Sequence, residues 1–204
     1  ESGDDTSFTE MHDYVMHYLE LFDTLRLDRF NLVGLSHGGY LAAKFASEHA
    51  HRVKKLALIA PAGMIDAMNE AVGQRGTPFL GVCVGMQLLA DAGEEFGRHA
   101  GLGWVPGTVR LIEPTDPAIK VPHMGWNKVS LNGTPPLLET GEAYFLHSYH
   151  FEAADPAHIA AITDHGGPLV AAVARDTIIG CQFHPEKSQT YGLSFLSRFL
   201  EWRP

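Results

Sequence analysis

The order of apolar and polar positions along the first half of the chain predicts alternating strands and helices. Apolar residues that recur every three or four positions are typical of amphipathic helices, and short continuous apolar runs between turn-forming residues are typical of buried strands. The predicted strands are 29–35, 53–60 and 77–82, and the predicted helices are 11–25, 39–50, 64–72 and 85–96. This alternation predicts a parallel sheet with right-handed crossovers.

The pattern changes after Gly97, where the apolar stretches become shorter and are separated by Gly, Pro, Asn and Asp. Short strands divided by such residues predict antiparallel hairpins or a mixed extension of the sheet. An amphipathic helix is predicted over 188–202, at the end of the chain. No repeat, low-complexity segment or long linker divides the sequence, so residues 1–204 are predicted to form a single α/β domain.

Composition and charge argue against several classes of partner. The 204 residues carry a formal net charge of −9 and no basic tract, which argues against nucleic acid or an anionic membrane as a partner. No apolar run approaches the roughly 20 residues that span a bilayer, and the polar, acidic first ten residues are not typical of a signal peptide. The two cysteines are too few for a disulfide framework, so a reducing, cytoplasmic setting is expected.

The twelve histidines raise the question of a metal site. They are scattered along the sequence, and neither an H-E-x-x-H nor a C-x-x-C spacing occurs. We therefore expect no metal ion and no other cofactor.

Two pentapeptides have the form glycine–x–nucleophile–x–glycine at the end of a predicted strand. They are GLSHG at 34–38, which contains Ser36, and GVCVG at 81–85, which contains Cys83. In such an elbow the glycines let neighbouring backbone approach closely, and the amide groups at the start of the next helix favour a thiolate or an oxyanion. A glycine-flanked Ser or Cys can also simply end a strand, so the presence of a base and an acid must decide between the two elbows.

A base and an acid occur together near the end of the chain. In the stretch QFHPEKS, His184 follows a predicted strand and Glu186 lies two residues further on, with Pro185 fixing the backbone between them. A neutral imidazole takes the proton of a thiol, and a carboxylate holds the imidazole in the required tautomer. The stretch also suits an ordinary surface turn, but together with Cys83 it predicts a Cys-His-Glu triad.

Five stretches in the second part of the chain carry a resemblance to a known family. They are GTPFLGVCVGMQLL, GLGWVPGTV, VPHMGWN, YFLHSYHF and GCQFHPEKSQ. From about Met64 to the C-terminus the chain resembles the class I glutamine amidotransferases, and within them the glutaminase subunit of imidazole glycerol phosphate synthase, which serves histidine biosynthesis. The resemblance implies a flavodoxin-like, three-layer α/β domain with a mostly parallel sheet and an antiparallel extension in its C-terminal half.

The resemblance also implies roles for the residues of the triad and the oxyanion hole. Cys83 is expected to attack the side-chain amide of glutamine and form a glutamyl thioester, with His184 as base and then acid and with Glu186 orienting His184. The backbone N–H of Val84 is expected to supply one oxyanion donor. Gly63 is the candidate for the second donor, since the sequence has PAGM where the family has a PGVG-type loop.

Substrate and partner contacts follow from the same resemblance. Gln87 and the backbone around His147, Ser148 and Tyr149 are expected to hold the amino-acid end of the substrate, glutamine. The family passes ammonia to a (β/α)₈ synthase subunit, which is therefore the expected protein partner. The interface candidates, for which ordinary turn and core packing is the alternative, are His123, Trp126 and Asn127.

Residues 1 to about 63 do not resemble that family. They resemble the middle of an α/β-hydrolase, with the helix before the nucleophile strand, the elbow at Ser36 and a later strand that ends in APAG. The acid, the base and the first strands of such a hydrolase are missing, so Ser36 is interpreted as a vestigial nucleophile. The sequence therefore indicates a chimera joined near Gly63 and Met64. Engineering is favoured over natural fusion because each part is intact up to a sharp boundary and the first residue is not Met.

The leading functional hypothesis is a glutaminase that supplies ammonia to a synthase partner and is impaired by its replaced N-terminal third. Loss of one oxyanion donor typically lowers a rate by roughly 10²–10³. A folded chimeric scaffold without useful catalytic activity is the second hypothesis, and residual serine esterase activity at Ser36 is the third.

Overall fold

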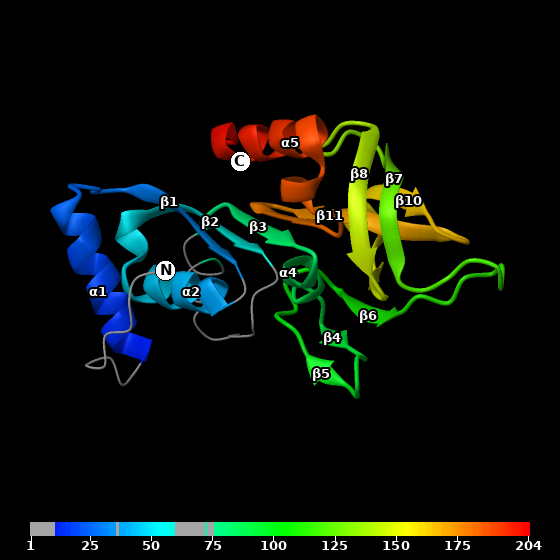
Figure 1. Ribbon diagram of the computed structural model, residues 1–204, viewed down its shortest axis with the longest axis horizontal. Helices are drawn as coiled ribbons and strands as arrows, with labels where there is room; N and C mark the ends of the chain where they lie inside the picture. The colour runs from blue at the N-terminus through cyan, green and yellow to red at the C-terminus, as the bar shows by residue number, and fades with distance from the viewer. Residues whose placement is uncertain (1–10, 36, 60–71, 73–75) are drawn as a thin grey trace.

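The computed structural model describes residues 11–35, 37–59, 72 and 76–204, and Figure 1 shows how their helices and strands are arranged. Ser36, Gly63 and the predicted helix 64–72, apart from Val72, lie outside the described residues. Within the described ranges, no helix is long and apolar enough to cross a membrane.

An eight-stranded sheet forms the centre of the molecule, in the order β1-β2-β3-β12-β11-β10-β7-β8. The strands are β1 (Phe30–Leu35), β2 (Val53–Ile59), β3 (Phe79–Val82), β12 (Ile178–Cys181), β11 (Pro168–Arg175), β10 (Ile159–Asp164), β7 (His123–Leu131) and β8 (Gly141–His147). The first four run parallel to one another, and all later pairs are antiparallel. The predicted parallel sheet and its antiparallel extension are both present, and the extension is as wide as the parallel part.

Helices cover both faces of the parallel part, which produces three layers (Figure 1). α1 and α2 lie on one face and α5 lies on the other, with the bounds Met11–Thr24, His37–Glu48 and Gln189–Glu201. Because side chains alternate along a strand, Phe79 of β3 packs with the α2 side, whereas Leu80 and Val82 pack with the α5 side. The apolar runs predicted at 53–60 and 77–82 are therefore strands that are buried on both faces, whereas the run predicted at 29–35 is the partly exposed β1.

A second, smaller sheet joins the antiparallel part of the molecule, in the order β5-β4-β6-β9. Its strands are β4 (Ala92–Gly93), β5 (His99–Ala100), β6 (Gly107–Leu111) and β9 (Tyr149–Ala153). The chain passes from β8 of the large sheet to β9 of the small sheet at Ser148. This crossing places His147, Ser148 and Tyr149 where the chain passes between the two sheets.

The predicted helix 85–96 is wrong beyond its first turn. α4 covers only Val84–Gln87. After it, the backbone carbonyl groups of residues 88–90 accept hydrogen bonds from the backbone at 102–105, and Ala92–Gly93 pairs with β5 and β6. The apolar spacing that predicted a longer helix therefore comes from a segment whose backbone bonds to the loop at 102–105 and to the small sheet instead.

Candidate active site

Cys83 lies in the tight turn between β3 and α4, near the middle of the large sheet. Its backbone has φ 55° and ψ −113°, a conformation that a residue with a side chain rarely adopts and that is typical of a strained nucleophile elbow. A Cβ at Gly81 would lie 2.4 Å from the carbonyl oxygen of Gly85, so the strand and the helix approach this closely only with glycine. The elbow therefore holds the sulfur at the carboxyl end of β3.

The first elbow has the same packing of strand against helix. A Cβ at Gly34 would lie 2.4 Å from the carbonyl oxygen of Gly38 and 2.7 Å from Cβ of Ala42. β1 and β3 run parallel with β2 between them, so both elbows lie at the carboxyl ends of the parallel strands. Ser36 itself lies outside the described residues, so the structure positions this elbow without positioning its hydroxyl.

The Cys83 sulfur lies in a buried environment that favours the thiol. It accepts a hydrogen bond from the Gln182 side-chain amide at 3.7 Å, and the thiol donates to the Leu146 carbonyl oxygen at 3.9 Å. Burial raises the pKa of the Cys83 thiol, and the Glu186 carboxylate raises it further. The Val84 backbone N–H and the Gln182 amide act in the opposite direction without reversing the shift.

His184 and Glu186 form a hydrogen-bonded pair near this elbow. His184 Nδ1 and Glu186 Oε1 are 2.8 Å apart. The backbone around them is anchored because Ser188 Oγ donates to the His184 carbonyl oxygen at 2.6 Å and accepts the Tyr144 backbone N–H at 2.9 Å. In the described part of the chain, no hydrogen bond joins the His184 ring to the Cys83 sulfur. The base and the acid are thus joined by a hydrogen bond, whereas the base and the nucleophile are not.

A pocket of about 290 Å³ opens at the Cys83 elbow. It is lined by Cys83, Val84, Gln87, Glu95, Pro122, Leu146, His147, Ser148 and Tyr149. The predicted nucleophile, one predicted oxyanion donor and all four predicted substrate-binding residues therefore share one pocket. Sequence analysis missed Glu95, whose carboxylate suits the ammonium group of an amino acid. Nothing marked it, because it belonged to a predicted helix that is in fact a loop.

The Gln87 side chain is fixed by two hydrogen bonds within the protein. Nε2 donates to the Tyr149 carbonyl oxygen at 2.9 Å and to Gln182 Oε1 at 3.0 Å. Both N–H groups of the amide are thereby used, so a ligand in the pocket can pair with Gln87 only through its Oε1 atom. The predicted substrate contact of Gln87 is thus limited to accepting a hydrogen bond.

The three interface candidates on β7 differ in exposure. His123 is 3% exposed, stacks on the Phe145 ring and lies with Nδ1 3.0 Å from His147 Nε2. Its side chain therefore contacts the interior, contrary to the prediction of a partner contact, because it stands at an inward-facing position of the strand. Asn127 is partly exposed and bonds to His123 at 3.0 Å, and Trp126 is 49% exposed.

His123 and His147 form a buried pair, and His147 also lines the pocket. His147 Nδ1 lies 2.8 Å from the Tyr149 carbonyl oxygen, which only accepts hydrogen bonds. In the neutral ring Nε2 must then accept, so His123 donates through Nδ1. Burial lowers the pKa of His123 to about 3 and the pKa of His147 to about 4. Two neutral rings thus orient a carbonyl group beside the pocket.

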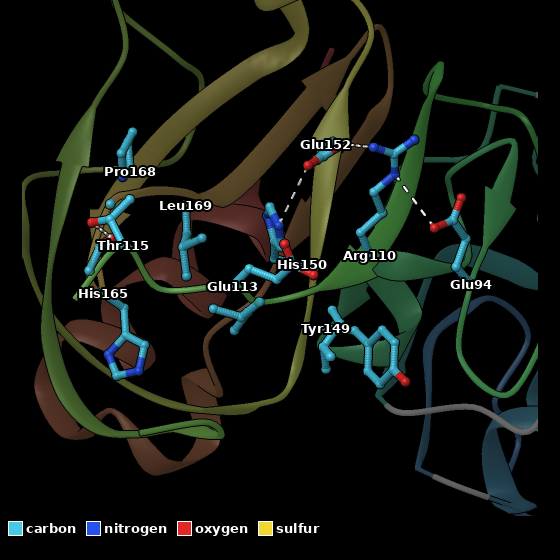
Figure 2. Close-up of a pocket in the computed structure, with 14 residues that line it drawn as sticks. Glu94, Arg110, Glu113, Thr115, Tyr149, His150, Glu152, His165, Pro168 and Leu169 are labelled. Atoms are coloured by element: carbon cyan, nitrogen blue, oxygen red, sulfur yellow. Dashed lines mark hydrogen bonds and ion pairs between the residues drawn. The ribbon is translucent and has the colours of Figure 1, made fainter. Parts of the chain in front are cut away.

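A larger cavity, of about 660 Å³, shares Tyr149 with this pocket (Figure 2). Figure 2 shows Arg110 between Glu94 and Glu152, with ion-pair distances of 3.6 and 3.3 Å. Within this larger cavity Arg110 therefore pairs with two of the carboxylates, and neither Cys83 nor Cys181 lines the cavity. Among the described residues, no group of three or more His, Cys, Asp or Glu side chains is arranged to hold a metal ion. The smaller pocket is therefore the candidate active site.

Comparison with known families agrees with this site. A family model described as glutamine amidotransferase class-I matches residues 59–202, and the chain belongs to this family. Its relatives include two proteins named imidazole glycerol phosphate synthase subunit HisH. The one from Zymomonas mobilis is 60% identical over 149 residues, which cover 72% of this chain and 70% of the relative. The one from Rhodospirillum rubrum is 52% identical over 147 residues, which cover 70% of this chain and 69% of the relative.

Two further comparisons concern the fold and the first third of the chain. A crystal structure of a glutamine amidotransferase matches with a TM-score of 0.51 at 15% identity, over 83% of this chain and 99% of that one, which supports the fold. A model described as alpha/beta hydrolase fold matches residues 2–78. The two family matches overlap over 59–78, a range that includes the joint predicted near Gly63 and Met64. The first third is thus similar to a different family from the rest.

Proposed function

We propose that the chain is a glutaminase that hydrolyses glutamine to glutamate and ammonia. The observation that carries the proposal is the strained Cys83 elbow in a pocket that Val84 and Glu95 also line. The family match and the names of the relatives support the same activity. The hydrogen-bonded His184–Glu186 pair supports a Cys-His-Glu triad.

In the proposed reaction Glu95 binds the ammonium group of glutamine. His184 takes the proton of Cys83, the sulfur attacks the amide carbon of the substrate side chain, and the Val84 N–H binds the oxyanion. The tetrahedral intermediate collapses, the C–N bond breaks, and ammonia leaves with the proton from His184. A water molecule that gives its proton to His184 then attacks the thioester, and glutamate leaves as the thiol is restored.

The resting geometry supports a slow enzyme. The Cys83 thiol is stabilised by burial and has no hydrogen bond to His184, so a movement of one side chain must complete the triad. The second oxyanion donor is assigned to Gly63, outside the described residues. We expect bound glutamine or a bound partner to favour the closed arrangement.

The partner in this proposal is a (β/α)₈ synthase subunit that receives the ammonia. The relatives are named as subunits of a synthase, which supports such an assembly. Met124 and Trp126 are 66% and 49% exposed on β7, and we assign the interface to them and to Asn127.

Ammonia release from glutamine tests the proposal, measured with and without the synthase subunit that pairs with HisH in Zymomonas mobilis. Cys83→Ala should lower the rate by at least about 10³-fold, because the nucleophile is removed, whereas Ser36→Ala should leave the rate unchanged. Ammonia release that survives Cys83→Ala contradicts the proposal. Failure of the unmodified chain to release ammonia, even with the synthase subunit, favours the scaffold without catalytic activity. Esterase activity lost in Ser36→Ala and kept in Cys83→Ala favours the serine elbow.

A further inference from the structure

Gln182 is a fully buried polar side chain beside the nucleophile, and the mechanism above gives it no role. It follows β12, which pairs in parallel with β3 so that Cys181 lies opposite Val82. The Cys83 backbone N–H donates to the Cys181 carbonyl oxygen at 2.8 Å, which ties the elbow to this strand. Gln182 and Cys83 are therefore neighbours because two adjacent strands end side by side.

The orientation of the Gln182 amide is fixed by its surroundings. The Tyr149 carbonyl oxygen can only accept, so the Gln87 group that lies 2.9 Å from it must be the NH₂ group. The same NH₂ group lies 3.0 Å from one end of the Gln182 amide, which must then be the oxygen. The other end, 3.7 Å from the Cys83 sulfur, is therefore the NH₂ group of Gln182.

We propose that Gln182 is a catalytic residue, whose side-chain N–H donates to the Cys83 sulfur and stabilises the thiolate before it attacks. The inference rests on the proposed role of Cys83 as the nucleophile. A thiolate formed here loses the hydrogen bond to the Leu146 carbonyl oxygen, since that bond needs the thiol proton. The Val84 N–H, which favours the thiolate in the resting state, is assigned to the oxyanion during the reaction. Gln182 is then the donor that remains on the sulfur.

The rate of Cys83 alkylation by iodoacetamide, measured against pH on the full chain, tests this assignment. Only the thiolate reacts, so the profile reports the pKa of the thiol. Gln182→Met keeps the length of the side chain and removes the donor. It should raise that pKa by about one unit and slow alkylation at neutral pH by about tenfold, as expected for one hydrogen bond to a charged group. An unchanged profile in folded Gln182→Met overturns the proposal.

Two controls separate this effect from general damage. Cys83→Ala gives the background from Cys181, which is fully buried. Thr163→Val alters another buried polar residue, on β10, and should leave the profile unchanged. Alkylation needs no glutamine turnover, so an inactive chain with a donor-dependent profile contradicts the glutaminase and supports only the hydrogen bond from Gln182 to the Cys83 thiolate. An active chain whose alkylation profile is the same with and without the Gln182 donor contradicts the Gln182 assignment alone.

A measurement on the unmodified chain covers the case in which Gln182→Met does not fold. With ¹⁵N-labelled protein, the side-chain amide protons of Gln182 should shift as pH is raised through the pKa of Cys83, because their acceptor becomes an anion. The shift should disappear in Cys83→Ala. An amide signal of Gln182 that does not change through this titration overturns the proposal.

Discussion

The two elbows of this molecule have the same backbone construction and different neighbours. In each, a glycine at the end of a strand lies so close to the next helix that a Cβ would come within 2.4 Å of a carbonyl oxygen. β3 lies inside the sheet, between β2 and β12, and all four of its residues are buried. Among the described strands β1 is at one edge, and Val33 and Leu35 are 59% and 62% exposed. An elbow thus obtains partners from the strands beside it, and an elbow at a sheet edge has a neighbour on one side only.

The difference extends to what each elbow can contact. Cys83 has Gln182 from the neighbouring strand, Leu146 from β8 and the pocket at the β8–β9 crossing. The first elbow belongs to residues 2–78, which a family model described as alpha/beta hydrolase fold matches. The same strand–turn–helix backbone packing thus occurs twice in this chain, and the strands beside each elbow decide which side chains it contacts.

The largest effect is expected when both elbow glycines are replaced by alanine in separate variants. In Gly81→Ala the new Cβ meets the backbone of Gly85, which is enclosed by buried strands, so the free energy of unfolding should fall by about 3 kcal/mol. In Gly34→Ala an edge strand and α2 can move apart, and a loss of about 1–2 kcal/mol is expected. Urea unfolding measures both. Equal losses would show that position in the sheet does not decide how strongly an elbow is held.

Sequence patterns correctly predicted those strands in which the apolar residues are also the buried ones. The runs at 53–60 and 77–82 became β2 and β3 because both faces of the sheet are covered. The helix predicted at 85–96 failed because buried loop residues had a helical spacing by coincidence, and Glu95 was missed with it. Gln182 was visible in the QFHPEKS stretch, but its role depends on register between β3 and β12, which no local pattern contains.

A smaller loss in the free energy of unfolding is expected when the pH is lowered. It should come from two buried histidines in the amidotransferase part, His123 and His147. The folded pKa values of about 3 for His123 and about 4 for His147 lie below the ordinary value of 6.5. Below pH 6.5 the unfolded chain binds protons that the folded chain does not. The free energy of unfolding should therefore fall as pH falls, by about 2.5 kcal/mol for the two histidines together between pH 7 and pH 5.5.

Urea unfolding at the two pH values measures this dependence. His147→Asn should remove about half of it, whereas the exposed His99→Asn should change nothing. Ring resonances of the unmodified protein give a second measure, since neither buried histidine should titrate above pH 5. A full titration of either ring near pH 6.5 would contradict the predicted acid sensitivity.

The smallest predicted effect tests how the two parts of the chain are joined. Lys55 lies on β2, in the hydrolase-like part, and is 4% exposed. Its ammonium group donates to the carbonyl oxygens of Phe199 and Trp202, the latter at 2.7 Å, at the C-terminal end of α5. The Phe199 carbonyl oxygen also accepts the Trp202 backbone N–H at 3.3 Å, and a cation is favourable at this end of a helix. A residue of one part thus caps a helix of the other.

Lys55→Met keeps the apolar stem and deletes the cap, so we expect a loss of about 1 kcal/mol in the free energy of unfolding, measured in urea. Lys54→Met, the exposed neighbour on the same strand, is the matched control and should change stability by less than about 0.5 kcal/mol. If Lys55→Met is as stable as Lys54→Met, the ammonium group gains no more from the two carbonyl groups than its burial costs. Apolar packing of β2 against Phe199 and Leu80 would then suffice to join the two parts.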